Sequence, residues 1–186
     1  MTNLSVILAC NFKGGIGYKN EIPWNIPEEM KKFRDITTST HHPDKKNAVI
    51  MGRKTWSSLK RSLPNRLNVI ITSQREFEST DSETLVMNSV QNAIEVCRQY
   101  DDIDKIFIIG GSQIYNDVIK NCALYNVEKI YLSVIFYDKE GQQNYDTYVN
   151  IKTIFKKFDI YKDIHYSQHA ENRLFASFIC LPKYLK

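Results

Sequence analysis

The sequence predicts an α/β domain built around a largely parallel β-sheet. Short apolar runs rich in Val, Ile and aromatic residues alternate with segments of helical periodicity, which is typical of strands joined by crossover helices. The last two apolar runs are separated only by the polar stretch Asp163 to Asn172, so we expect the sheet to end in a long antiparallel hairpin. A length of 186 residues, 42% of them hydrophobic, fits one domain with a sizeable core.

The elements follow in chain order from these patterns. Compact apolar runs bounded by polar or turn residues predict strands over Leu4 to Asn11, Ala48 to Met51, Leu67 to Thr72, Thr84 to Met87, Lys105 to Ile109, Val127 to Phe136, Thr153 to Lys162 and Leu174 to Leu181. Periodic apolar residues predict helices over Glu28 to Thr38, Lys54 to Ser58, Val90 to Tyr100 and Ser112 to Ile119. Pro27 suits the first helical position, and Ser112 is a candidate cap. The polar stretch Lys139 to Asn144 has strands on both sides and is predicted to be a loop, so residues 1–186 form a single domain.

Composition argues against several classes of protein. The formal net charge is +4 and no run of Lys or Arg exceeds two residues, so charge does not indicate nucleic-acid binding, although it suits a small anionic ligand. The four cysteines are far apart and no histidine has zinc-ligand spacing, so we predict no metal site and no disulfide framework. His41, His42, His165 and His169 are assigned to polar loops. No apolar run approaches the roughly 20 residues that cross a bilayer, so a cytoplasmic location is expected.

Three predicted strands end in groups that suit phosphate. One runs into Gly110-Gly111 and a helix, a second into Gly52-Arg53-Lys54-Thr55, and a third ends at Thr72-Ser73-Gln74-Arg75. Ligands of parallel sheets bind at the carboxyl ends of strands, where the start of a helix attracts anions. A tight turn explains the Gly-Gly pair equally well, and P-loop spacing is absent. Together the three ends predict an extended polyanion such as a dinucleotide, with NADP preferred to NAD because the cations suit a 2'-phosphate.

Two adjacent acids, Glu28 and Glu29, open the helix after Pro27. First-turn acids complement the positive end of the helix dipole, which explains either residue without any chemistry. Helical phase separates them, because Glu29 is in line with Phe33 on the apolar side. Glu28 is in line with Lys32, and we predict a solvated ion pair between those two residues. A carboxyl group on the apolar side is costly to bury unless it has a partner, so Glu29 is the candidate functional acid.

Several motifs, taken in order, resemble dihydrofolate reductase over essentially the whole chain. They are Gly15-Ile16-Gly17, Ile22-Pro23-Trp24, an acid five residues past Trp24 with a phenylalanine four residues further on, Met51-Gly-Arg-Lys-Thr-Trp56, Leu63-Pro64-Asn65-Arg66 and Ile109-Gly-Gly-Ser-Gln-Ile-Tyr115. The resemblance implies a central eight-stranded, mostly parallel sheet with one antiparallel edge strand and helices on both faces. It also implies a monomeric enzyme that reduces 7,8-dihydrofolate to tetrahydrofolate with NADPH, supports thymidylate and purine synthesis, and binds antifolates.

The resemblance assigns the substrate contacts. It selects Glu29 to accept hydrogen bonds from the 2-amino and N3 region of the pterin and to promote protonation at N5. Arg66 would hold the α-carboxylate of the glutamate tail as a bidentate fork. Ser133 stands where the family usually has a threonine bonded to the acid. The implied pocket walls are Ile7, Ala9, Met30, Phe33, Leu59, Leu63 and Ile109, with Tyr115 near the nicotinamide side. Most of these residues are apolar, so they are equally well explained as members of the hydrophobic core.

Cofactor contacts follow from the same resemblance. The pyrophosphate would contact Thr55, Gly110, Gly111 and Ser112, and the 2'-phosphate would contact Arg53, Ser73 and Arg75. The other implied cofactor contacts are Ala9, Ile16, Gly17, Lys54, Thr72, Gln113 and Ile114. The segment Lys13 to Ile22 carries three glycines and would be a mobile loop that closes over the cofactor.

Small departures from the family pattern leave the functional groups in place. Ser133 keeps the hydroxyl of the usual threonine, and Asn65 replaces a common glycine, which asparagine can do where the turn needs positive φ.

Two alternative functions remain. One is another reductase on this fold, such as the pyrimidine reductase of riboflavin synthesis, which would not need Glu29 with Arg66. The other is a non-catalytic nucleotide-binding or RNA-binding protein. The chain contains no thymidylate synthase segment, so a fused bifunctional form would need residues beyond these.

Overall fold

The structure is a computed structural model that describes residues 2–59, 61–74, 77, 84–136, 144–169 and 172–185, with the side chains of 163–169 and 172–174 left undescribed. Arg75, most of the predicted loop at 139–144, and the side chains of His165 and His169 therefore lie outside the described part of the chain.

The strands are β1 (Asn3–Asn11), β2 (Gly15–Gly17), β3 (Lys46–Gly52), β4 (Arg66–Ile71), β5 (Thr84–Met87), β6 (Ile103–Gly110), β7 (Val127–Ile135), β8 (Thr147–Tyr148), β9 (Phe158–His169) and β10 (Asn172–Pro182). The helices are α1 (Pro27–Thr38), α2 (Arg53–Ser58), α3 (Val90–Gln99), α4 (Ser112–Lys120), α5 (Cys122–Tyr125) and α6 (Ile151–Lys157), with a final 3-10 turn, η1 (Lys183–Leu185).

The main sheet has eight strands in the order β5-β4-β3-β6-β1-β7-β10-β9. Pairing is parallel from β5 through to β7 and antiparallel at β7–β10 and β10–β9. The predicted eight-stranded, mostly parallel sheet is thus confirmed, with antiparallel pairing confined to one edge. The reversed strand is β10, and β9 beside it forms the edge through the predicted hairpin. A second, small sheet pairs β2 with β8.

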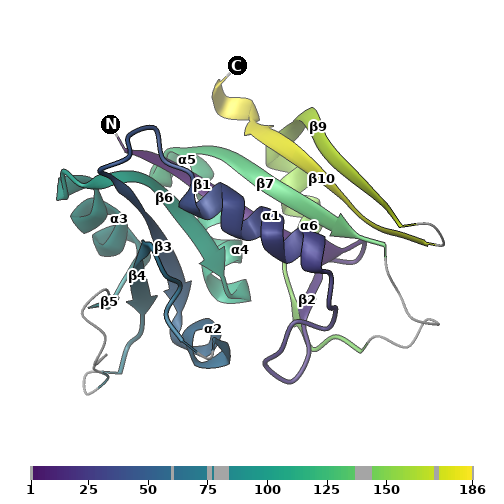
Figure 1. The fold of residues 1–186 in the computed structure, drawn as a ribbon, viewed down its shortest axis with the longest axis horizontal. Helices are drawn as coiled ribbons and strands as arrows, with labels where there is room; N and C mark the ends of the chain where they lie inside the picture. The colour runs from purple at the N-terminus through teal and green to yellow at the C-terminus, as the bar shows by residue number, and fades with distance from the viewer. Residues whose placement is uncertain are drawn as a thin grey trace.

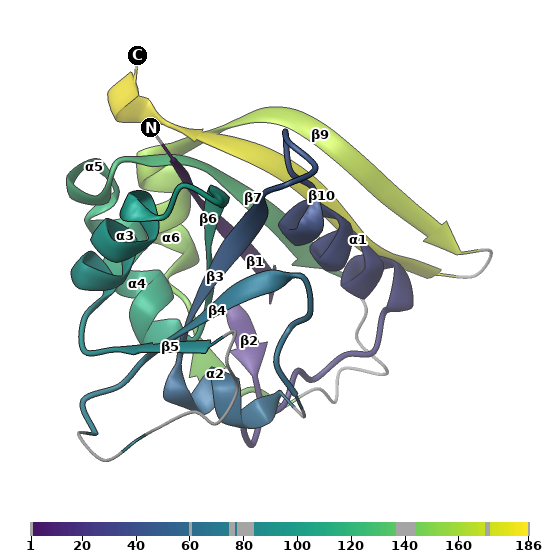
Figure 2. The same cartoon turned by 60° about the vertical axis from the view of Figure 1, so that its left-hand side comes forward.

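Helices cover both faces of the main sheet, and each face has its own core. Figure 1 shows α1 lying across the front of the sheet, and Figure 2 shows α3, α4, α5 and α6 gathered on the other side. The larger hydrophobic cluster belongs to that side and draws on every helix from α3 to α6. A smaller cluster lies beneath α1 and includes Phe33 and Ile36 of that helix. We call these two sides the α1 face and the opposite face.

One predicted strand is partly wrong. Residues 153–162 were expected to form one strand, but α6 occupies Ile151–Lys157 and β9 begins only at Phe158. The Asn150 side chain accepts a hydrogen bond from the Thr153 backbone N–H at 3.1 Å and so caps the helix. Ile151, Ile154 and Phe158 then follow helical spacing into the large core, where Ile154 is fully buried. A short helix and the start of a strand lie within one apolar run here, and the spacing of its apolar residues does not show where the helix ends and the strand begins.

The assignment of His165 and His169 to a polar loop is wrong, because β9 continues to His169 and both residues pair with β10. The remaining predicted elements agree with the structure within a few residues. The elements without a predicted counterpart are short: β2, β8, α5 and η1. Pro27 occupies the start of α1, as predicted. The predicted cap at Ser112 is wrong, because Gly111 is the N-cap of α4 and Ser112 is already helical.

All four cysteines are free and buried. Burial raises the pKa of Cys10 and Cys97 to about 12, which keeps both thiols protonated and unreactive.

Candidate active site

The carboxyl ends of β3 and β6 meet at one point of the sheet. Adding a Cβ to Gly111 would place it 3.0 Å from the Thr55 hydroxyl oxygen, so the starts of α2 and α4 lie against each other. The Gly110–Gly111 peptide bond is cis, and Gly110 has a φ of +124°, a conformation that favours glycine. A Cβ at Gly110 would also meet the Tyr115 ring at 3.1 Å. Two of the predicted phosphate-binding strand ends therefore lie side by side, with Gly110 buried and Gly111 partly exposed.

Tyr115 ties these strand ends to the central strand. Its hydroxyl donates a 2.8 Å hydrogen bond to the backbone carbonyl of Ile7 on β1, and the residue is 6% exposed. Burial raises its pKa strongly, and the charge of Glu29 raises it further. The tyrosine is therefore neutral at all ordinary pH values, and it lies close enough to Glu29 to sense its charge.

Glu29 is a half-buried acid whose carboxyl group lies beside a pair of hydroxyls. The Ser133 hydroxyl on β7 hydrogen-bonds Glu29, and the Ser133 and Ser177 oxygens lie 3.0 Å apart. Either hydroxyl can donate in this bond; when Glu29 is ionised and accepts from Ser133, the donor is Ser177 on β10. Burial raises the pKa of Glu29, while the hydrogen bond from Ser133 and the charge of Lys32 oppose that shift. The site therefore holds a carboxyl group whose proton affinity is higher than usual.

The predicted ion pair between Glu28 and Lys32 is wrong. The Lys32 ammonium nitrogen is buried and has no hydrogen-bond partner among the described residues, and the charge that acts on it is that of Glu29. Glu28 itself is exposed. Lys32 turns inward because it is three residues from Glu29 and one from Phe33, at the border of the buried face of α1.

Most of the predicted substrate walls lie together on the α1 face. Ile7, Phe33, Leu59, Leu63 and Ile109 all belong to the cluster beneath α1. Ala9 packs instead against a neighbouring cluster that contains Trp24 and Phe175. Met30 is 53% exposed and packs in none of these clusters, so if it contacts a ligand it must do so from the open side of α1.

Arg66 is a buried cation at the far end of the same face. It is 3% exposed, and its guanidinium donates to the Thr37 hydroxyl at 2.7 Å and to the Pro64 carbonyl at 3.1 Å. Burial lowers its pKa, and the positive charge of Arg34 lowers it further. No carboxylate among the described residues forms a salt bridge with it. Asn65 beside it has a φ of 60°, as predicted for an asparagine that replaces glycine in this turn.

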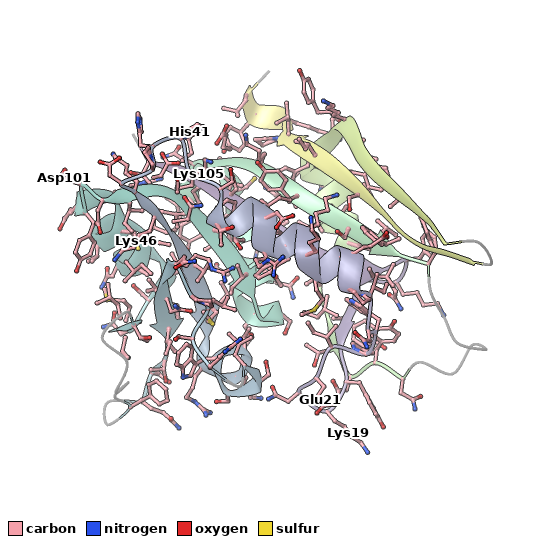
Figure 3. The ribbon with its side chains drawn as sticks, viewed as in Figure 1. Lys19, Glu21, His41, Lys46, Asp101 and Lys105 are labelled. Carbon is pink, nitrogen blue, oxygen red and sulfur yellow. The ribbon has the colours of Figure 1, made fainter. Side chains whose placement is uncertain are left out.

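The predicted cofactor contacts are partly gathered at an open cleft of about 490 Å³. Its lining residues are Asn20, Arg53, Lys54, Ser57, Asp146 and Thr147. Gly17 pairs with Thr147, and the Lys19 backbone N–H donates to Asp146 at 2.8 Å, so the loop that follows β1 closes one side of the cleft. Figure 3 shows Lys19 and Glu21 on this loop, far from His41 and Lys105 at the other end of the molecule.

The remaining predicted cofactor residues have differing surroundings. Ile114 is 8% exposed, belongs to the large core and lies beneath Gly52, whereas Gln113 and Ser73 are exposed. Ile16 packs against the large core. The Thr72 hydroxyl accepts a hydrogen bond from the Gln74 backbone N–H at 3.1 Å. The segment Lys13 to Ile22 holds local structure, with β2 and a bridge between Tyr18 and Glu21.

Sequence reasoning missed Lys32 and Ser177 as neighbours of Glu29. Lys32 could have been found, because it is three residues from Glu29 on the same helix. Ser177 had no usable signal, since it reaches the site only through the pairing of β10 with β7. Within the described residues, no group of three His, Cys, Asp or Glu side chains could hold a metal ion. Nor does any described helix have the length and apolarity needed to cross a bilayer.

The structure is thus an α/β protein in which most candidate substrate residues lie on the α1 face, while candidate cofactor residues lie at the carboxyl ends of β3 and β6. A profile of the dihydrofolate reductase family matches residues 3–183. The chain belongs to the dihydrofolate reductase family.

Individual relatives agree with this assignment. The chain is 35% identical over 183 residues to a dihydrofolate reductase of Buchnera aphidicola, covering 97% of this chain and 98% of that protein. It is 40% identical over 123 residues to the dihydrofolate reductase of Candida albicans, covering 64% of this chain and 62% of that protein. It is 40% identical over 121 residues to the bifunctional dihydrofolate reductase-thymidylate synthase of Daucus carota, covering 61% of this chain and 23% of that protein. The match thus spans less than two thirds of the Candida and Daucus proteins.

Proposed function

We propose that this protein reduces 7,8-dihydrofolate to 5,6,7,8-tetrahydrofolate with NADPH as the reductant. The observation that carries the proposal is Glu29, a half-buried acid that lines one cavity with Ile7 and Phe33 beneath α1 and whose pKa is raised by burial. A pterin presents an amino group and a ring N–H side by side, and one carboxylate accepts hydrogen bonds from both. In that position Glu29 orients the ring and favours protonation at N5.

The residues around Glu29 suit a flat aromatic substrate with a charged tail. Ile7, Phe33 and Ile109 provide apolar walls that exclude water from the ring. Arg66 offers a buried guanidinium without a described carboxylate partner, which fits the α-carboxylate of a glutamate tail. A rival reductase on this fold, such as the pyrimidine reductase of riboflavin synthesis, would not need Glu29 together with Arg66, so this pair favours dihydrofolate.

The residues at the strand ends fit a nicotinamide dinucleotide. Gly111 is partly exposed and lies beside the Thr55 hydroxyl, where a pyrophosphate would accept hydrogen bonds from this hydroxyl and from the start of α4. Arg53 and Lys54 line the adjacent cleft and favour the extra phosphate of NADPH over NADH. When bound, the cofactor supplies a hydride to C6 of the pterin. We assign Ser73 and Arg75 to the same 2'-phosphate, and Gln113 to the cofactor side of α4.

The proposal extends to the setting of the enzyme. We propose that the product supports one-carbon transfer in thymidylate and purine synthesis, that the enzyme acts as a cytoplasmic monomer of one domain, and that antifolates compete at the Glu29 pocket. The segment Lys13 to Ile22, which borders the cofactor cleft, is assigned the role of a closing loop.

The test is an assay that follows oxidation of NADPH in the presence of dihydrofolate, repeated with NADH and with an antifolate. We expect turnover with NADPH, weaker activity with NADH, and inhibition by the antifolate. Glu29→Gln should lower turnover at neutral pH by about 10²-fold or more, the scale of a lost acid-base group, while NADPH binding measured by fluorescence persists.

Glu28→Gln is the matched control for that experiment. It removes the same charge one residue away, on the exposed side of α1, and should leave turnover almost unchanged. Equal losses in the two variants would exclude Glu29 as the functional acid, and no turnover of wild-type protein with dihydrofolate would exclude the proposed activity. A non-catalytic nucleotide-binding protein would bind NADPH but never oxidise it.

A further inference from the structure

Lys32 is the most unusual charged residue of the described chain. Its ammonium nitrogen is buried and makes no hydrogen bond to any described residue. An ammonium group has three donors and is strongly hydrated in water, so burying it without partners is costly. Replacing a buried charge by an apolar side chain of similar length is often neutral or stabilising, so the charge of Lys32 is not explained by stability alone.

The surroundings of Lys32 identify the group with which its charge interacts. A small cavity of about 10 Å³ beneath α1 is lined by both Lys32 and Glu29, together with the hydroxyl-bearing Ser133 and Ser177. On the side of β10, the Lys32 nitrogen lies 6.0 Å from the centre of the Phe175 ring. Glu29 is the charged group with which Lys32 interacts in this cavity.

The other titratable groups near this pair are few among the described side chains. On α4, Tyr115 senses the charge of Glu29 but stays neutral. On β7 and β10, the facing polar groups are the Ser133 and Ser177 hydroxyls. On α1 itself, Lys31 points outward and pairs with Asp35 at 2.9 Å, with its side chain 67% exposed. Among the residues that line this cavity, the charged groups are thus one acid and one base on adjacent turns of one helix; the buried cation Arg66 lies at the far end of the face.

We propose that Lys32 is a positioning residue that keeps the Glu29 carboxylate ionised and aimed at the substrate site. The role assigned to that carboxylate rests on the proposed function, but the coupling between the two side chains does not. The lysine acts through charge and does not itself touch the substrate, because its nitrogen is enclosed between α1, β7 and β10.

Chemistry explains why such a neighbour is useful. A carboxyl group in an apolar pocket tends to take up a proton and lose the charge that recognises the pterin. A cation three residues along the helix opposes this, as the hydrogen bond from Ser133 does from the sheet. Burial also lowers the pKa of Lys32 to about 8, while Glu29 opposes that shift. The two groups therefore titrate as a coupled pair, and Lys32 is mostly charged at neutral pH.

The direct test is a ¹³C NMR titration of the Glu29 carboxyl group in the full-length protein without ligands, with Glu29→Gln used to assign the signal. Lys32→Met keeps the length and removes the charge, and it should raise the pKa of Glu29 by about 1 unit or more. Lys32→Arg keeps the charge and should restore most of the wild-type value. Lys31→Met, which removes an equal charge from the outer side of the same helix, should leave the Glu29 titration unchanged.

The proposal is overturned if Lys32→Met titrates like Lys31→Met, because a purely structural lysine stem is replaced adequately by methionine. It is also overturned if Lys32→Arg behaves like Lys32→Met. Removing a buried charge is not expected to unfold the protein, and Lys32→Gln provides a second uncharged variant should the methionine variant aggregate.

Activity provides the second readout. In Lys32→Met, the midpoint of the pH profile of turnover should move upward together with the pKa of Glu29, and an unmoved midpoint would exclude the catalytic part of the proposal. Failure of the proposed function looks different. In that case wild-type protein does not turn over dihydrofolate, whereas the NMR titration still reports whether Lys32 and Glu29 are coupled.

Discussion

The two faces of the central sheet differ in the residues they bury. The opposite face is a nearly continuous apolar core shared by four helices, and its strand positions carry Val, Ile, Leu and Cys. The α1 face carries a smaller apolar cluster. The buried polar and charged residues of the described chain all lie on α1 or on strand positions that face it: Ser5, Thr37, Asn47, Arg66, Asn68, Ser133 and Ser177.

This difference separates stability from function. The opposite face removes apolar surface from water, which is the dominant favourable contribution to folding. The α1 face instead uses buried hydrogen bonds to hold polar groups in place, as when Asn47 donates to the Thr37 and Ser39 carbonyls at 2.9 and 3.0 Å. Such groups add little net stability but would cost much if left unpaired. We therefore expect mutations on the opposite face to lower mainly the stability of the protein, and mutations on the α1 face to impair mainly its activity.

The largest effect on stability should come from the opposite face. Ile94 on α3 is 2% exposed within the large core, so Ile94→Ala should lower the free energy of unfolding by about 2–5 kcal/mol through lost burial and a cavity. Turnover per folded molecule should not change, since α3 lies away from Glu29. Urea denaturation with a parallel activity assay measures both, and a loss of turnover at full folding would contradict the separation of the faces.

Arg66→Leu should show the reverse behaviour. We expect KM for dihydrofolate to rise about 10²-fold, because a buried charge-assisted contact is lost, while KM for NADPH stays near the wild-type value. Stability should change little, since the Thr37 hydroxyl still donates to the Phe33 carbonyl at 2.7 Å. Steady-state kinetics with each substrate varied in turn distinguishes these outcomes, and an equal rise in both KM values would point to general damage.

Ser177→Ala probes the polar face more gently. The variant removes the hydroxyl that donates to Ser133 when Glu29 is ionised, and the net cost of one hydrogen bond is about 1 kcal/mol. We also expect the pKa of Glu29 to rise slightly, because Ser133 without its donor is a weaker partner for the carboxylate. Thermal unfolding and the NMR titration of Glu29 measure the two effects. Wild-type behaviour in both would mean that the serine pair does not support the acid.

The smallest expected effect is a dependence of stability on pH. The folded-state pKa of Glu29 lies above its ordinary value of 4.5, so the folded protein holds the proton more tightly than the unfolded chain. Below pH 4.5 the group has no effect, and as pH rises through the folded-state pKa it progressively subtracts stability. Glu29→Gln lacks this loss. Its stability relative to wild type should therefore increase from pH 4 to pH 7 in denaturation curves, and a decrease would contradict the raised pKa.

Much of the fold and part of the site could be predicted from sequence. Strand runs and helical periods located most elements, and helical phase separated Glu29 from Glu28. The region of α6 was misread because Ile151 to Phe158 supports either period until Asn150 caps the helix. Lys32 was placed in solvent because charged side chains are usually exposed. Its long aliphatic stem allows the nitrogen to reach inward. For a residue at the border of the apolar face, helical phase alone does not decide whether the side chain points inward or outward.

By itself, the sequence determined which side of each element faces the core, since helices repeat every 3.6 residues and strands every two. It also placed glycines and cations at the ends of particular strands. Only the tertiary structure decided which of these groups meet. Glu29, Ser133 and Ser177 come together because β7 pairs with β10 in a register that sets the two serines opposite each other under α1. That register depends on contacts between residues far apart in the chain, which local periodicity does not encode.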